Sequence, residues 1–397
     1  MGKNKQLERA ENHIFSTGLS DAGSVLAREN MKYGIAKIHS LQSCYGTEPN
    51  AIFISAPDES PNKSRISWAS GMSKGGKLVW GDGKEKLLIL DGRPAVCGML
   101  VGGLDRLPDT KKLAEKAHFI KDTHLELDGI PLSWDFGKGN HFIDVFSVKK
   151  LDGLDMPKYA FIIHASAPEF AADNPHGFGL CYDQSPLLSE MAYQEETPFG
   201  ALHVLYDGEA EEYMHFHQYA ESFAKRRRQV LAELLFGEFE ELSNPTHQKL
   251  LNYNEMILGV YATEHERDTI FPLTLRADLP AYLVRGKQSF TTENLGRLGF
   301  EDRAKELGVY HKLKNANIIP HGAGMTLLGV SDVSSVFEVD GIRYFKMSSR
   351  KNVGDVFLSD VDNMPFAYRD ARVVEKAVKL GMCELVAELK PECVLKI

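Results

Sequence analysis

Two short segments of the sequence carry residues that can take part in metal and phosphate chemistry. The first runs from Gly139 to Asp144 and places an amide, an imidazole and a carboxylate in an apolar stretch. The second runs from His321 to Gly324 and places an imidazole before two glycines. Imidazole nitrogens and carboxylate oxygens are common metal ligands, and glycine lets backbone approach a phosphate closely. Together the segments indicate metal and nucleotide chemistry.

Further candidate metal ligands lie at the ends of predicted strands. His141 and His164 are 23 residues apart, which fits adjacent strands that bring two imidazoles to one rim. Cys97 ends an apolar run at a glycine turn. Such a cysteine is either a small buried apolar residue or, as a thiolate, a ligand for borderline cations. His247 follows a break after a long predicted helix, and histidines in turns are mostly structural.

The helix predicted over 209–236 carries two features that resemble binding sites. His215 and His217 form an H-x-H pair. Side chains two residues apart on a helix point in directions that differ by about 200° around its axis, so we exclude His215 and His217 as a joint metal site. Arg227 and Arg228 lie in a basic run. We expect a solvated helix face there, with contacts to RNA phosphates as the alternative.

Composition limits the class of protein. The 397 residues are 43% hydrophobic, which is enough for a large core. The net charge of −9 argues against indiscriminate binding to polyphosphates. No run approaches the ~20 apolar residues of a membrane span, and the first residues lack the apolar core of a signal peptide. Five scattered cysteines do not make a disulfide scaffold, so we expect a cytoplasmic protein with reduced thiols.

The positions of the predicted elements indicate a single α+β domain over 1–397. β-branched and aromatic residues predict strands at 51–55, 87–90, 141–148, 159–165, 201–206 and 281–285. Helical periodicity predicts helices near 109–118, 186–194, 209–236, 293–307 and 369–383. Asp340-Gly341 predicts a hairpin over 335–346, because both residues accept the positive φ of a tight turn. The segment 58–84, rich in glycine, serine and lysine, is predicted to be a mobile loop.

Six motifs in order resemble the RtcB family of RNA ligases, and the resemblance runs over most of the chain. They are Cys97-Gly98-Met99, the segment from Gly139 to Asp144, His164-Ala165-Ser166, His247-Gln248, the segment from His321 to Gly324, and the tail, with Met364 to Asp370 and Glu392 to Lys396. The long helix with Phe223-Ala224 and Arg228 lies between the third and the fourth motif, as in the family. The resemblance implies mixed, largely antiparallel sheets around a central metal and nucleotide cleft, flanked by helices.

The activity that the resemblance implies is RNA ligation of the tRNA-splicing type. Such an enzyme uses GTP and Mn²⁺ to join RNA ending in a 3′-phosphate or 2′,3′-cyclic phosphate to RNA with a 5′-hydroxyl. His321 would form the covalent histidine–GMP intermediate. The implied partners are RNA with broken ends and GTP, with an accessory activator protein left open.

The resemblance also implies roles for individual residues. The metal ligands would be Cys97, His141, His164 and His247. The guanylate would be held by Asn140, Asp144, Gln248, Gly322, Gly324 and Lys396.

Departures from the family leave the number of metal ions and the activity open. Pro94 stands where the family has a metal-binding aspartate, and Asp91 can replace it only if the loop folds back. Ala167-Pro168 stands in place of a serine and a phosphate-binding arginine. We therefore expect either one or two metal ions at this site. The alternative function is an RtcB-like protein that binds RNA ends or nucleotide without ligating, with residual metal-dependent hydrolysis.

Overall fold

The computed structural model describes residues 2–137, 139–266, 270–314, 316–349 and 355–396. Helices and strands alternate through this part of the chain, so the α+β class is confirmed. The α-helices are α1 (Lys3–Asn12), α2 (Ala22–Cys44), α3 (Arg65–Ser70), α4 (Thr110–Asp122), α5 (Pro186–Met191), α6 (Asp207–Phe236), α7 (Thr292–Arg297), α8 (Glu301–Glu306), α9 (Tyr310–Lys314) and α10 (Arg372–Lys379).

A large sheet of twelve strands runs through the molecule in the order β1-β2-β3-β14-β13-β5-β9-β8-β24-β17-β16, with β12 paired to β5. Its strands are β1 (Ile14–Phe15), β2 (Ile52–Ser60), β3 (Lys74–Val79), β5 (Cys97–Leu104), β8 (Phe142–Lys150), β9 (Tyr159–Ala165), β12 (Glu240–Ser243), β13 (Thr246–Asn252), β14 (Glu255–Leu258), β16 (Ile270–Leu273), β17 (Ala281–Gly286) and β24 (Cys383–Leu395). Its pairs are antiparallel apart from β1 with β2. The prediction of mixed, largely antiparallel sheets is therefore confirmed.

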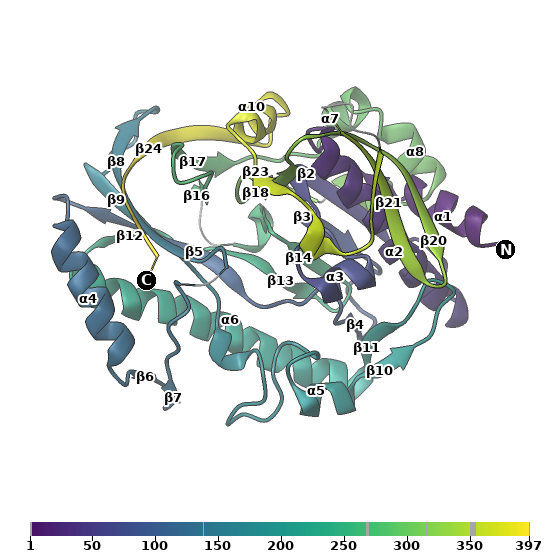
Figure 1. Cartoon of the computed structure of the whole chain (residues 1–397), viewed down its shortest axis with the longest axis horizontal. Helices are drawn as coiled ribbons and strands as arrows, with labels where there is room; N and C mark the ends of the chain where they lie inside the picture. Colours follow the sequence, from purple (N-terminus) through teal and green to yellow (C-terminus); the bar gives the residue numbers. More distant parts are fainter. Residues whose placement is uncertain (1, 138, 267–269, 315, 350–354, 397) are drawn as a thin grey trace.

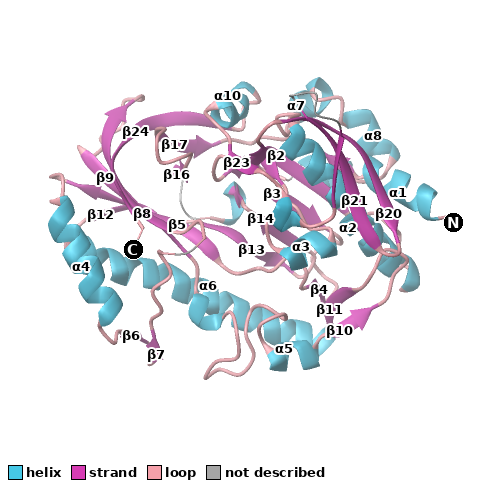
Figure 2. Cartoon of the chain, viewed as in Figure 1, coloured by secondary structure: helices cyan, strands magenta, loops and turns pink. Residues whose placement is uncertain are grey.

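Smaller sheets lie around this one. Their strands are β4 (Leu87–Ile89), β6 (Glu126–Leu127), β7 (Ile130–Pro131), β10 (Tyr193–Glu195), β11 (Leu202–Tyr206), β15 (Val260–Ala262), β18 (Ile318–Pro320), β19 (Met325–Leu327), β20 (Val330–Val339), β21 (Ile342–Ser349), β22 (Asp355–Leu358) and β23 (Phe366–Tyr368). Figure 1 shows α6 running along one side of the molecule, with α4 at its end and the C-terminus nearby. Most helices lie outside the strands, as Figure 2 makes clear.

Alternating residues of the central strands build two cores on opposite faces of the sheet. Leu100 and Phe161 pack with Leu231 of α6 on one face. Met99 and Ile162, one residue along on each strand, pack against β24 on the other face. This period of two is what a sheet buried on both sides requires. This alternation also determines which face of the sheet each side chain at the end of a strand points to.

Several predicted elements match the structure, and two predictions differ from it. The hairpin is confirmed, with positive φ at Asp340 and Gly341. The segment 58–84 is not a loop, because it holds the end of β2, α3 and β3, and much of it is buried. The helix predicted over 293–307 is two helices, divided near Gly299 with its φ of +69°. In the described residues, each helix is too short or too polar to span a membrane.

Candidate metal centre

Four neighbouring strands bring the sulfur and imidazole ligands together in the middle of the large sheet. Cys97 begins β5, His141 immediately precedes β8, His164 lies near the end of β9, and His247 lies in β13. The strand order β13-β5-β9-β8 makes them adjacent. The pairing of β13 with β5 shifts at His247, and such a bulge re-aims a side chain next to a functional site.

The ligand atoms lie at the spacing of a coordination sphere. Cys97 Sγ lies 3.4 Å from His141 Nε2 and 3.1 Å from His164 Nε2. His164 Nε2 lies 3.3 Å from His247 Nε2. Ligands held about 2.0–2.3 Å from one ion in tetrahedral geometry lie about 3.5 Å apart. Cys97, His141 and His164 therefore form a group that can hold a metal ion, with His247 beside it.

Hydrogen bonds to the far side of each ring fix the tautomers of two of these histidines. His164 Nδ1 lies 3.0 Å from the backbone oxygen of Asn140, and His141 Nδ1 lies 2.6 Å from an Asp135 carboxylate oxygen. Because these oxygens only accept, each Nδ1 donates its hydrogen. In the neutral form of each ring Nε2 keeps its lone pair, and both Nε2 atoms face Cys97 Sγ. This arrangement of a ligand and its supporting acceptor is usual in metal sites.

The electrostatics of the group favour a thiolate. Burial raises the pKa of the Cys97 thiol, but His164, His141 and His247 outweigh it and hold that pKa well below its usual value. Burial lowers the pKa of His141, yet the Cys97 thiolate and Asp135 raise it to about 10. Burial lowers the pKa of His247 well below its usual value. The thiolate and the neutral imidazole of His247 are the protonation states that a cation needs.

His321 lies against this group and is oriented by a carboxylate. Its ring centroid is 4.5 Å from that of His247. Asp58 Oδ2 accepts hydrogen bonds from His321 Nδ1 at 2.9 Å and from its backbone N–H at 3.1 Å. The carboxylate of Asp58 is fully buried. His321 therefore presents Nε2 with a lone pair, as a nucleophilic imidazole requires.

Three of the residues predicted to bind the nucleotide lie together at one end of β8. Lys396 Nζ donates to Gly139 O at 3.3 Å, next to Asn140. Burial raises the pKa of Asp144 to about 7, although Lys396 opposes this shift. Asp144 Oδ1 is buried and has no hydrogen-bond partner in the described part of the chain. The group has a buried acceptor that a ligand can use.

The other predicted nucleotide ligands are occupied by contacts within the protein. Gln248 Nε2 donates to Gly92 O and Arg93 O, and its Oε1 accepts from a lysine of β3. A Cβ at Gly322 would lie 3.0 Å from Thr274 O, and one at Gly324 would lie 2.1 Å from Asp58 O. Packing alone therefore explains the two glycines, and their contact with a nucleotide stays a prediction.

The prediction for Arg227 and Arg228 is wrong, because both side chains are completely buried. Arg227 Nε lies 2.9 Å from Glu169 and its Nη2 lies 3.0 Å from Asp135. Arg228 donates to Ala165 O and Asn244 Oδ1. Neither forms a solvated face or an RNA track. Arg227 instead holds the carboxylate that orients His141.

The metal group found among the described residues contains no carboxylate. Asp91 accepts from the His203 backbone N–H at 2.7 Å and from Tyr182 at 3.4 Å, so it is engaged elsewhere. Pro94 offers no ligand atom. The group as it stands offers thiolate and imidazole donors that could hold a metal ion.

Two functional carboxylates were not assigned from the sequence. Asp58 lies at the start of the segment 58–84, which was predicted to be a mobile loop, so its role was not assigned. Asp135 carries no sequence signal, because its role comes from a loop that returns to His141.

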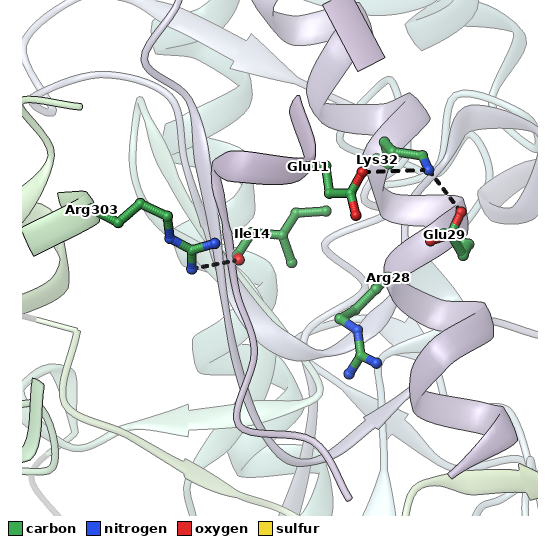
Figure 3. Close-up of a pocket in the computed structure, with 6 residues that line it drawn as sticks. All are labelled: Glu11, Ile14, Arg28, Glu29, Lys32 and Arg303. Carbon is green, nitrogen blue, oxygen red and sulfur yellow. Dashed lines mark hydrogen bonds and ion pairs between the residues drawn. The ribbon is translucent and has the colours of Figure 1, made fainter. Parts of the chain in front are cut away.

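A separate pocket of about 180 Å³ lies between α1, α2 and α8 (Figure 3). Lys32 pairs there with Glu29 and Glu11, and Arg303 donates to the backbone oxygen of Ile14. Arg28 pairs with Glu59 outside the lining, and the Arg303 guanidinium lies over the Phe15 ring, so these side chains are engaged within the protein and we assign the pocket no ligand.

Comparisons with known proteins leave the family open: neither a family model nor a curated protein matches this sequence.

Proposed function

We propose that the chain is a divergent RtcB-like RNA ligase that joins 3′-phosphate or 2′,3′-cyclic phosphate ends to 5′-hydroxyl ends through a histidine–GMP intermediate. The observation that carries the proposal is the position of His321. A histidine held by a buried carboxylate lies 4.5 Å, ring to ring, from a histidine beside a cysteine–histidine metal group. A purely structural histidine has little need of both neighbours.

The chemistry assigned to the chain's residues begins at His321. Its Nε2 attacks the α-phosphorus of GTP, forming a P–N bond as pyrophosphate leaves. The GMP group then passes to the RNA 3′-phosphate, and the 5′-hydroxyl displaces GMP from that phosphorus. Asp58 stabilises the positive charge that develops on the ring, as carboxylates do beside catalytic histidines. When bound, a divalent cation neutralises negative charge on the phosphate oxygens.

Asp144 and Lys396 suit a guanylate. A buried carboxylate oxygen without a partner can accept from the N–H groups of a guanine edge. Lys396 supplies a cation at the same end of β8. The thiolate and imidazole donors accept several borderline cations, and Mn²⁺ is the one that the proposed activity implies.

The test is covalent labelling with α-³²P GTP and Mn²⁺. Wild-type protein should acquire an acid-labile label, His321→Ala should acquire none, and Asp58→Asn should label more slowly. A full label on His321→Ala, or none on wild type, would reject the proposal.

A second candidate is an RtcB-like protein that binds RNA ends or nucleotide without ligating. It is favoured by the metal group's lack of a carboxylate and by Ala167-Pro168 in place of a phosphate-binding arginine. Labelled protein that transfers no GMP to a 3′-phosphorylated RNA would favour this candidate.

A further inference from the structure

Lys74, which lies in β3, is a cation near the candidate metal group, and most of the hydrogen-bonding capacity of its ammonium is unused. Its Nζ donates to Gln248 Oε1 at 2.8 Å. In the described part of the chain it pairs with no carboxylate, whereas Lys77 on the same strand lies 2.8 Å from Glu255. An ammonium has three hydrogens to donate. Two of them are available to a ligand.

Lys74 is half-buried, and two lysines that are buried show how this chain satisfies an ammonium that has no ion pair. Lys37 donates to two backbone oxygens, those of Ala69 and Ala201. Lys312 donates to both oxygens of Asn50. Lys74 donates to one acceptor in the described residues, so the protein satisfies less of its hydrogen-bonding capacity than it does for Lys37 and Lys312.

The position of Lys74 places it between the metal group and His321. Gln248, which accepts from it, follows His247 and lies opposite Cys97 in the pairing of β13 with β5. On the other side, a Cβ at Gly259 would lie 3.7 Å from the Gly75 backbone N and 3.2 Å from His321 Cε1. The backbone that follows Lys74 and the ring of His321 are therefore close neighbours.

The charges between the metal group, Lys74 and His321 favour the binding of a ligand with two negative charges. Burial lowers the pKa of Lys74, but the Cys97 thiolate opposes that shift and helps to keep the ammonium charged. The metal group offers one thiolate and imidazoles, so a divalent ion together with the ammonium leaves net positive charge. A ligand with several negative oxygens satisfies both the free N–H groups and this charge.

We propose that Lys74 binds a phosphate monoester, with its ammonium on phosphoryl oxygens that also face the metal group and His321. The assignment rests on the proposed function for the source of this phosphate, which is either the nucleotide or the 3′ end of an RNA. Lysine acts on phosphate as a point charge, so a neutral side chain of similar length removes the interaction and keeps most of the packing.

The experiment is calorimetric titration of the Mn²⁺-loaded full chain with GMP, uridine 3′-phosphate and guanosine. Lys74→Met should weaken binding of at least one phosphate tenfold or more, with guanosine binding unchanged. Loss for GMP alone places Lys74 at the nucleotide, and loss for uridine 3′-phosphate alone places it at the RNA end. The matched control is Lys77→Met, on the same strand, which should bind all three probes like wild type.

Phosphate affinities in Lys74→Met within twofold of wild type would overturn the assignment, and so would a wild type that binds neither phosphate. Mn²⁺ affinity should be equal or higher in the variant, because a neighbouring positive charge is gone. If Lys74→Met does not fold, Lys74→Gln serves for the same titrations. If phosphate binding depends on Lys74 but GTP does not label the wild-type protein, the ligase proposal is rejected and the Lys74 site is kept. If GTP labels the wild-type protein but Lys74→Met binds phosphate with full affinity, the Lys74 site is rejected and the ligase proposal is kept.

Discussion

At the scale of single residues, the centre depends on what lies behind each imidazole. His141, His164 and His321 each place Nδ1 against an oxygen, from Asp135, Asn140 and Asp58 respectively. In its neutral form each ring therefore presents Nε2 with a lone pair. The same ring type then serves two purposes, since two rings face the thiolate of Cys97 and the third is held as a candidate nucleophile.

Glu59, next to Asp58, gives a prediction about pH and stability. Burial raises the pKa of Glu59 from 4.5 to about 7, although Arg28 and Ser16 lower it. Between these two values the folded state holds a proton that the unfolded chain has released. The stabilisation is complete below pH 4.5 and is lost as the pH rises through 7, by up to about 3 kcal/mol.

Glu59→Gln should lack this part of the pH dependence. Urea unfolding of both proteins at pH 5, 6, 7 and 8 measures it, and the wild type should lose stability relative to the variant as pH rises. Glu115→Gln, at an exposed position, is the control and should follow the wild type. Parallel curves for wild type and Glu59→Gln would contradict the pKa assignment.

Sequence reasoning found the residue types of the centre but not their supports. Cys97, His141, His164 and His247 stand in motifs whose order could be recognised. Asp58 and His321 are 263 residues apart, and only the folded topology brings them together.

At the scale of elements, α6 shows why a basic run was misread. Its periodicity predicted the helix, but four consecutive basic residues do not reveal which of them face the sheet. Arg226 is 53% exposed and pairs with Asp128, whereas Arg227 next to it is fully buried. The difference comes from the strands and loops that pack against the helix.

This contrast within one helix gives the second prediction. Arg227→Met removes the arginine that pairs with Glu169 and Asp135, and breaking a buried ion pair costs about 3–5 kcal/mol. Arg226→Met removes an exposed pair and should cost at most about 1 kcal/mol. Denaturant unfolding of the two variants compares them directly. Equal losses in both would show that the buried network does not stabilise the fold.

The segment 58–84 was misread for a different reason. Glycine, serine and lysine are typical of loops, yet here two glycines allow close backbone packing. A Cβ at Gly75 would lie 2.6 Å from the Glu59 backbone, and one at Gly76 would lie 2.3 Å from the Phe53 ring. Composition alone cannot distinguish a flexible glycine from one that is required by a close contact.

At the scale of the whole molecule, the metal group lies where the sheet joins distant parts of the chain. Its ligands come from β13, β5, β9 and the approach to β8, and β24 next to β8 carries the C-terminal residues. A cation bound there would link four adjacent strands. It would bind the folded chain and not the unfolded one, so its binding free energy would add to the stability of the fold.

The third prediction follows from that linkage. Mn²⁺ at 100 times its dissociation constant should stabilise the folded protein by about 2.7 kcal/mol. For a chain of this length that is a rise in Tm of about 3 °C, which scanning calorimetry with Mn²⁺ and with a chelator can resolve. Cys97→Ala should abolish the rise, whereas Cys44→Ala, at an exposed cysteine, should retain it. An unchanged rise in Tm in Cys97→Ala would place the ion elsewhere. The same scans test the prediction of a single domain, because the large sheet should unfold as one unit. Two separate unfolding transitions would contradict it.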